Sequence, residues 1–159
     1  MSELSHLDAS GAARMVDVAG KAVSVRTASA SGRVQVSSAV VALLREGGVP
    51  KGDALAVARI AGIMGAKKVP DLVPLCHPIA LHGVEIALRV DDDAVVIEAT
   101  CRTADRTGVE MEALTAVAVA ALALVDMVKA VDPGAVITDV QVETKTGGTL
   151  GDWRRPRSP

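Results

Sequence analysis

Residues 84–101 read VEIALRVDDDAVVIEATC, and after a short polar loop residues 109–131 read VEMEALTAVAVAALALVDMVKAV. The first segment alternates apolar and polar residues on both sides of the turn at residues 91–93, which predicts a β-hairpin. The second contains neither Gly nor Pro, which predicts a long helix that is buried nearly all round in its middle. The segment from Val136 to Val142 alternates again and predicts a strand whose even-numbered residues share one face. The order strand, strand, helix, strand favours an α+β fold with helices on one face of an antiparallel sheet.

The first half of the chain adds a strand and two helices to this plan. Residues 15–37 alternate valines with polar residues and predict β-structure, and residues 38–45 predict a short helix that stops at a glycine pair. Asp53 is a plausible N-cap for a longer helix over residues 54–69, in which two interior glycines, Gly62 and Gly65, indicate close packing against another backbone. Three prolines predict an extended, rigid connection over residues 70–78.

Length and composition limit the class of protein. The 159 residues predict a single domain over 1–159, with a flexible N-terminal arm at 1–14 and a flexible tail at 150–159. Seventeen basic and nineteen acidic residues give a net charge of −2, and one Trp is the only aromatic residue, so a nucleic-acid partner is not expected.

Three further features of the sequence predict a cytoplasmic protein. The longest apolar run, residues 113–125, is shorter than the ~20 residues that span a bilayer, so no membrane partner is expected. The N-terminus lacks the pattern of an export signal. Cys76 and Cys101 form no disulfide framework, which favours a reducing compartment.

The long helix carries the first candidates for acid–base chemistry. Glu112 and Asp126 are 14 positions apart, within about 40° of one helix face but ~21 Å apart along the axis. Two such helices, antiparallel about a two-fold axis, could bring Glu112 of one copy towards Asp126 of the other, which predicts a site shared between subunits. Lys129 lies one turn from Asp126, and the pair fits either a plain helix-end salt bridge or an acid and base tuned against each other.

The loops carry candidates for binding an anion. His77 lies between prolines next to Cys76, and it fits a hydrogen-bond donor to phosphate better than a metal ligand, because the spacing of the histidines suits no helix-borne metal site. A cysteine nucleophile is disfavoured, because adjacent side chains of extended backbone point to opposite faces. Lys51, Lys67 and Lys145 each lie beside a Gly or Pro break; each fits a solvated charge or an anion ligand. The loop at residues 145–148 could also offer backbone N–H groups to phosphate.

Five motifs resemble the molybdenum cofactor biosynthesis protein C family, the cyclic pyranopterin monophosphate synthases. They are MVDV (15–18), KGD followed by ARIAGI (51–63), DLVPLCHP (71–78), TGVEMEALTA (107–116) and DMVKAV (126–131). The resemblance covers nearly the whole chain, with the motifs in the family's order. It implies a ferredoxin-like α+β plait assembled as a homohexamer, a trimer of dimers, with the active site near the dimer interface.

The resemblance also implies a reaction and its residues. A lyase of this family converts (8S)-3′,8-cyclo-7,8-dihydroguanosine 5′-triphosphate into cyclic pyranopterin monophosphate and diphosphate, with no cofactor and no metal. Asp126, Lys129 and Lys51 match the family's catalytic positions. The substrate-binding positions correspond to Leu75, Cys76, His77, Met111 and Glu112, and further to Lys67, Lys145, Arg26 and Glu110.

Three other functions remain open at this stage. A metal-assisted nucleotide hydrolase would lose its activity to a chelator, and an RNA-binding plait would retain RNA in a filter-binding assay with a salt titration. A regulatory subunit would keep the fold without the chemistry. The presence of Lys51, His77, Glu112, Asp126 and Lys129 together argues against this last reading.

Overall fold

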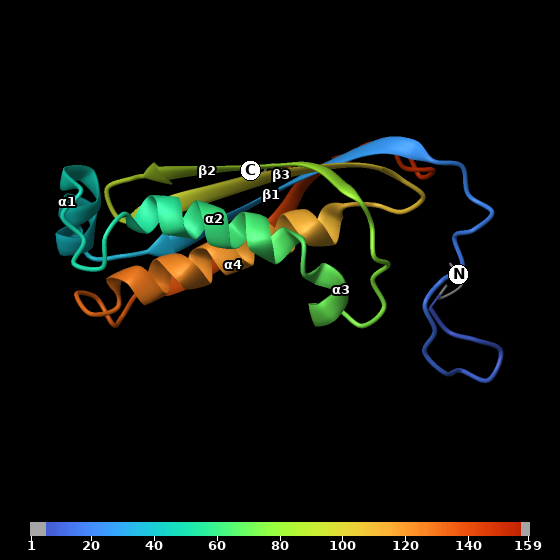
Figure 1. Cartoon of the computed structure of the whole chain (residues 1–159), viewed down its shortest axis with the longest axis horizontal. Coiled ribbons are helices and arrows are strands. Elements are labelled where there is room, and N and C mark those ends of the chain that lie inside the picture. Colours follow the sequence, from blue (N-terminus) through green and yellow to red (C-terminus); the bar gives the residue numbers. More distant parts are fainter. Residues whose placement is uncertain (1–5, 157–159) are drawn as a thin grey trace.

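The computed structural model describes residues 6–156, which form one sheet with helices on one of its faces (Figure 1). The elements in chain order are β1 (Ser24–Gln35), α1 (Ser38–Glu46), α2 (Ala54–Ala66), α3 (Val69–Leu72), β2 (Leu81–Val90), β3 (Ala94–Asp105), α4 (Glu110–Val128), β4 (Val136–Thr146) and β5 (Trp153–Arg154). The strands lie in the order β2-β3-β1-β4-β5, and all neighbours pair antiparallel. The first four strands with α2 and α4 have the connectivity of a ferredoxin-like plait, so the predicted fold class is confirmed.

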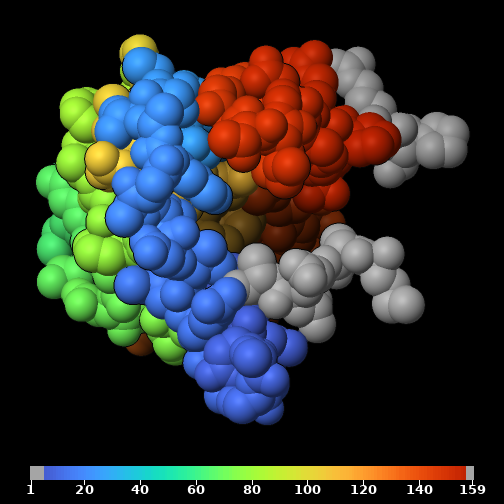
Figure 2. Space-filling model, turned by 90° about the vertical axis from the view of Figure 1, so that its right-hand side faces the viewer, coloured from blue at the N-terminus to red at the C-terminus, as the bar shows by residue number. Residues whose placement is uncertain are grey.

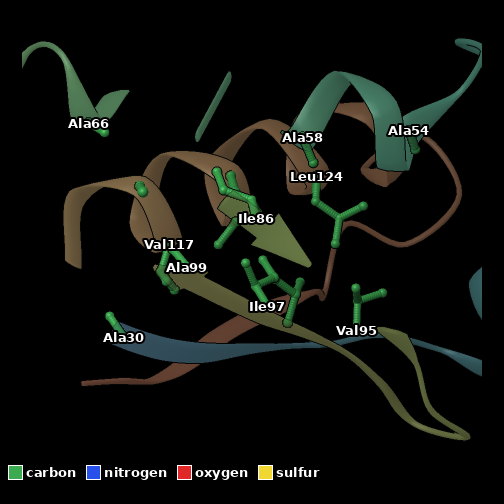
Figure 3. Close-up of a cluster of buried hydrophobic side chains, with 14 of the residues drawn as sticks. Ala30, Ala54, Ala58, Ala66, Ile86, Val95, Ile97, Ala99, Val117 and Leu124 are labelled. Carbon is green, nitrogen blue, oxygen red and sulfur yellow. The ribbon is translucent and has the colours of Figure 1, made fainter. Parts of the chain in front are cut away.

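The hairpin and the long helix occur where the sequence predicts them. In the β2–β3 hairpin, Val90 pairs with Val95 across the acidic turn, and Val95, Ile97, Ala99 and Cys101 of β3 are all buried. Helices α4 and α2 lie side by side on the same face of the sheet (Figure 1). Figure 3 shows side chains of α4, such as Leu124 and Val117, above Ile97 and Ala99 of β3. The core is built almost wholly from aliphatic side chains, as expected from the near absence of aromatic residues.

The two glycines of α2 allow this helix to lie close to α4. A Cβ atom added to Gly62 would lie 2.8 Å from the backbone oxygen of Ala116 and would clash with the tip of Ile86. A Cβ atom added to Gly65 would lie 2.7 Å from Val119. The predicted close approach of two backbones is therefore confirmed.

Gly62→Ala is expected to destabilise the protein by about 1–3 kcal/mol, because the added methyl group must push against the backbone of α4. The measurement is the free energy of unfolding in urea at a fixed protein concentration. Gly48→Ala is the matched control, since a Cβ atom there would meet only Leu43, at 3.4 Å. Equal stability of the two variants would contradict the close packing of α2 on α4.

Two local predictions are wrong. The proline-rich segment 70–78 is not extended throughout, because Val69–Leu72 form the short helix α3; Pro70 sits in its first turn, where the missing N–H group costs no hydrogen bond. In β4 the even-numbered residues do not share one face. Thr138 lies opposite Arg33 on the outer face of the sheet, whereas Val142 lies opposite Ala30 on the core face. One register shift between β4 and β1 lies between Thr138 and Val142 and inverts the alternation there, and a second lies between Val142 and Thr144.

Helix α4 is buried on one face rather than all round. Leu124 is fully buried, but Leu122 is 60% exposed, and α2 likewise exposes Val57, Ile60 and Met64. By length and composition alone α4 could cross a membrane. In this structure it is the central helix of the domain, with half of its apolar stretch buried inside the fold.

The described parts of the two chain ends make a few contacts. Leu7 and Ala13 form an isolated bridge, and β5 pairs with Thr144 and Lys145 at the end of β4. Residues 1–5 and 157–159 of the predicted arm and tail lie outside the described residues. The mobility of both ends stays a prediction.

Candidate active site

A cavity of about 420 Å³ lies where α4 begins. Its walls come from the loop that ends the proline-rich segment, the first turn of α4 and the N-terminal segment, which crosses this end of the molecule (Figure 2). The lining includes the predicted residues Leu75, Cys76, His77, Glu110, Met111 and Glu112, together with Val16, Val18 and Lys21. Motifs far apart in the sequence therefore meet at one site.

Glu112 is the buried acid of this cavity. Its side chain is in the first turn of α4, and the residue is only 4% exposed. Burial disfavours the charged carboxylate and raises the pKa of Glu112 to about 7, with a smaller contribution in the same direction from Glu110. A carboxyl group with this pKa can both donate and accept a proton near neutral pH.

The surroundings of both cysteines disfavour the thiolate form. Cys76 lines the cavity, and its pKa is raised by burial and by the negative charge of Glu112. The same two causes raise the pKa of the more deeply buried Cys101 to about 12. Both shifts favour the protonated thiol over the thiolate.

A second, smaller cavity of about 160 Å³ adjoins the first and shares Lys21, Gly108 and Glu110 with it. Its lining is rich in cations, which are Lys21, Arg26, Arg106 and Lys145. Arg26 is 7% exposed, and its Nε donates to the carbonyl oxygen of Asp105 at 3.1 Å. Lys145 Nζ lies 3.2 Å from a carboxylate oxygen of Glu110, the only acidic residue among the described residues of this lining. Four cations against one carboxylate suit an anion such as a phosphate chain.

The loop at residues 145–148 contributes to this cavity differently from the prediction. Gly147 adopts φ +80°, and its N–H group donates to a carboxylate oxygen of Asp152 at 3.1 Å. That backbone donor is already engaged by a side chain of the same chain. The side chain of Lys145 is therefore the main contribution of the loop to an anion site.

The third group of candidates lies at the other end of α4. The carboxylate oxygens of Asp126 lie 2.7 Å from Lys129 Nζ and 3.3 Å from Lys51 Nζ. Lys51 Nζ also donates to the backbone carbonyl oxygen of Asp126 at 2.8 Å. The hydrogen bond from Lys129, and to a smaller extent the one from Lys51, holds the pKa of the Asp126 carboxyl below its usual range. The predicted pairing of Asp126 with Lys129 is confirmed, and the structure adds Lys51 to it.

The predicted residues, except Lys67, thus lie at two separate places in one chain: around the two adjoining cavities and around Asp126. The residues around Glu112 and those around Asp126 occupy opposite ends of α4, ~21 Å apart along its axis. Lys67 joins neither group: it caps the C-terminus of α2, is exposed and lines neither cavity. Within residues 6–156, no three His, Cys, Asp or Glu side chains converge as a metal site.

The sequence model of the MoaC family matches residues 15–148, a range that contains both groups of candidates. The chain belongs to the MoaC family. It is 72% identical over 152 residues to a protein of Streptomyces coelicolor, with 96% of this chain and 89% of that protein covered. It is 68% identical to a Nocardioides protein, with 96% of both covered, and 60% identical to a Mycobacterium tuberculosis protein, with 96% and 92% covered. The first two relatives are named cyclic pyranopterin monophosphate synthase, and the third cyclic pyranopterin monophosphate synthase 2.

Sequence reasoning missed two cations of this MoaC-family site. Lys21 lines both cavities, and its carbonyl oxygen accepts a hydrogen bond from Arg106 Nε at 2.9 Å. Lys21 follows Gly20, the same lysine-beside-glycine pattern that singled out Lys51 and Lys145, so a consistent reading would have found it. Arg106 lies in a polar loop with several charged residues, and only the tertiary structure distinguishes it from them.

Gly108→Ala is expected to raise the KM for the substrate roughly two- to fivefold, the size expected for the loss of an ion pair near the surface, with little change in kcat. Gly108 lines both cavities of this MoaC-family protein, and an added methyl group would displace the carboxylate of Glu110 from its place beside Lys145. Steady-state kinetics measure the effect. The control is Gly20→Ala, since nothing lies within 4 Å of a Cβ atom there. An unchanged KM would mean that Glu110 is not held against Gly108.

Proposed function

We propose that this chain is a cyclic pyranopterin monophosphate synthase. It converts (8S)-3′,8-cyclo-7,8-dihydroguanosine 5′-triphosphate into cyclic pyranopterin monophosphate and diphosphate, a step of molybdenum cofactor biosynthesis. The observation that carries the proposal is the junction of the two cavities: a cation-rich one beside a larger one that contains a buried carboxyl group with a pKa of about 7. The names of the MoaC-family relatives support it.

The two cavities match the two parts of this substrate. The cation-rich cavity suits the triphosphate, because Arg26 and Lys145 are held in place before the anion arrives and need no reorganisation when diphosphate departs. The larger cavity suits the purine-derived ring, whose rearrangement needs proton transfers and no redox step. Glu112 is a candidate for such transfers at neutral pH.

Asp126, Lys129 and Lys51 are proposed as the catalytic group. The two amines are held by one carboxylate, and this contact orients them and can pass protons between them. Because this group lies far from the cavities of its own subunit, the proposal places it in the active site of a neighbouring subunit. The protein is then a homohexamer, a trimer of dimers, with each site near a dimer interface. The exposed apolar faces of α2 and α4 support assembly, since they offer surface for a second copy to cover.

The shared site is tested by mixing two inactive variants. Lys51→Ala subunits and Glu112→Gln subunits are unfolded together in denaturant and refolded as a mixture. If each site takes Glu112 from one subunit and Lys51 from the other, each mixed dimer contains one intact site and one site that lacks both residues. Random pairing makes half of the dimers mixed, so about a quarter of the wild-type activity is restored. If both residues serve a site within one subunit, the mixture stays inactive, and the intersubunit proposal is wrong.

The activity itself is tested with purified protein and the cyclised dihydroguanosine triphosphate. Equal amounts of pterin product and diphosphate are expected, with none from GTP. Turnover that is unchanged by a chelator would separate this lyase from a metal-assisted hydrolase. Release of orthophosphate, or no reaction, would contradict the proposed function. A nucleotide-derived substrate also supports a cytoplasmic location, which fractionation of the cells would check.

A further inference from the structure

The MVDV motif at residues 15–18 contacts His77 through the backbone carbonyl group of Val16. The proposed function assigns no role to this contact. His77 Nε2 lies 2.6 Å from the carbonyl oxygen of Val16. A carbonyl oxygen can only accept a hydrogen bond, so Nε2 must carry the proton. Whenever the ring of His77 is neutral, the lone pair is therefore on Nδ1. Within residues 6–156, no protein group hydrogen-bonds to Nδ1, and His77 lines the larger cavity.

The contact comes from a short segment that carries an internal turn and is anchored at its C-terminal end. Residues 16–21, named here the strap, run past both cavities, and Val16, Val18 and Lys21 line them. Within the strap, Asp17 accepts the N–H of Ala19 at 2.8 Å, and Lys21 N–H donates to the Val18 oxygen at 3.0 Å. Arg106 Nε holds the far end at the Lys21 oxygen. The position of the Val16 oxygen is therefore fixed by the turn that follows it and by a second anchor.

We propose that the Val16 carbonyl group is a positioning element that fixes His77 with its proton on Nε2, so that Nδ1 receives a proton or hydrogen bond from the ring portion of the substrate. Phosphate oxygens are acceptors, so a neutral His77 held in this way does not donate to the triphosphate, in contrast to the prediction from sequence. When Nδ1 takes a proton from a substrate N–H or O–H group, both electrons of that bond stay on the substrate. The imidazolium then keeps its Nε2–H bond to Val16, which the charge strengthens. The catalytic consequence rests on the proposed function.

The first test reads the tautomer directly and requires no turnover. Full-length protein labelled with ¹⁵N-histidine is examined by solid-state NMR, and His77→Gln identifies the signals of His77. The neutral ring is expected as the Nε2–H tautomer. A neutral ring with its proton on Nδ1, or an even mixture of the two forms, would overturn the proposal.

The second test compares two variants, each of which keeps a nitrogen at the position of only one of the two ring nitrogens. The amide nitrogen of Gln can take the place of Nε2 and keep the bond to Val16, whereas that of Asn takes the place of Nδ1 and cannot reach it. Hydrogen exchange of residues 16–21 is expected to stay near wild type in His77→Gln and to be faster by tenfold or more in His77→Asn. His82→Asn, on the outer face of the sheet, is the control. Equal rates of hydrogen exchange at residues 16–21 in the Gln and Asn variants would contradict the proposed role of the Val16 carbonyl group.

The third test asks which part of the ligand His77 meets. Inorganic diphosphate, titrated calorimetrically, is expected to bind His77→Gln within twofold of wild type and Lys145→Ala at least tenfold more weakly. An equal loss in both variants would place His77 on the phosphate and overturn the proposal. All three tests are independent of turnover, so a failed activity assay would contradict the proposed function but leave the tautomer of His77, and its contact with Val16, standing.

Discussion

Lys51→Ala is expected to lower product formation by at least about a hundredfold while leaving the assembly of the protein unchanged, and Lys129→Ala is expected to do the same. Both amines contact the carboxylate of Asp126, so either change removes a positioned cation and half of the contacts that hold that carboxylate. All three side chains are substantially exposed, and exposed ion pairs contribute only ~0–1 kcal/mol to stability. The fold should therefore survive either change.

Product formation is measured beside the mass from size-exclusion chromatography. Lys68→Ala is the matched control: Lys68 also pairs with a nearby aspartate, Asp71, at 3.4 Å, but both lie outside the proposed site. Its activity should equal that of the wild type. Turnover near the wild-type rate in either variant would overturn the proposed catalytic role of that lysine, and a lower mass than that of the wild type would show that the lysine serves assembly instead.

Glu112→Gln is expected to abolish turnover and, at the same time, to remove a pH-dependent loss of stability. The pKa of Glu112 is about 7 in the folded protein and ordinarily 4.5, so between these values the folded state holds a proton that the unfolded state has released. Stability then falls as the pH rises through this window, by up to about 3 kcal/mol in total, and no further above pH 7. Gln stays neutral throughout, so the variant lacks this fall.

Urea unfolding at pH 5 and pH 8, at one protein concentration, measures the difference. Relative to wild type, the Gln variant should gain stability at pH 8 and little at pH 5. Glu98→Gln, an exposed carboxylate on β3, should leave the pH dependence as it is. The same pH dependence in wild type and Glu112→Gln would show that Glu112 is not held neutral by burial.

The fold was largely predictable from local pattern, and the errors have identifiable causes. Alternation predicts β2 and β3 well because both strands pair without interruption over the hairpin, apart from one shift near Leu81. In β4 the same pattern fails, because two register shifts turn neighbouring residues to opposite faces; Asp139, with φ +55°, lies in one of them. The proline at position 70 fits both an extended chain and the first turn of a helix, and only the structure decides between them.

The sequence predicts the candidate residues of the site but not their arrangement. The motifs identify His77, Glu112, Asp126 and Lys51, and helix geometry alone separates Glu112 from Asp126. The contact between Lys51 and Asp126 joins residues 75 positions apart, and the strap reaches His77 across 61 positions. Such contacts depend on how the whole chain packs, and no local pattern encodes them.

The length of α4 is itself a constraint on this enzyme. The helix carries Glu112 near its first residue and Asp126 near its last, so its residue count sets both the spacing and the relative direction of the two groups. Deleting one residue from its middle would shorten the span by only about 1.5 Å but would turn Asp126 through about 100°. We therefore expect insertions or deletions within α4 to abolish turnover even where the helix still folds.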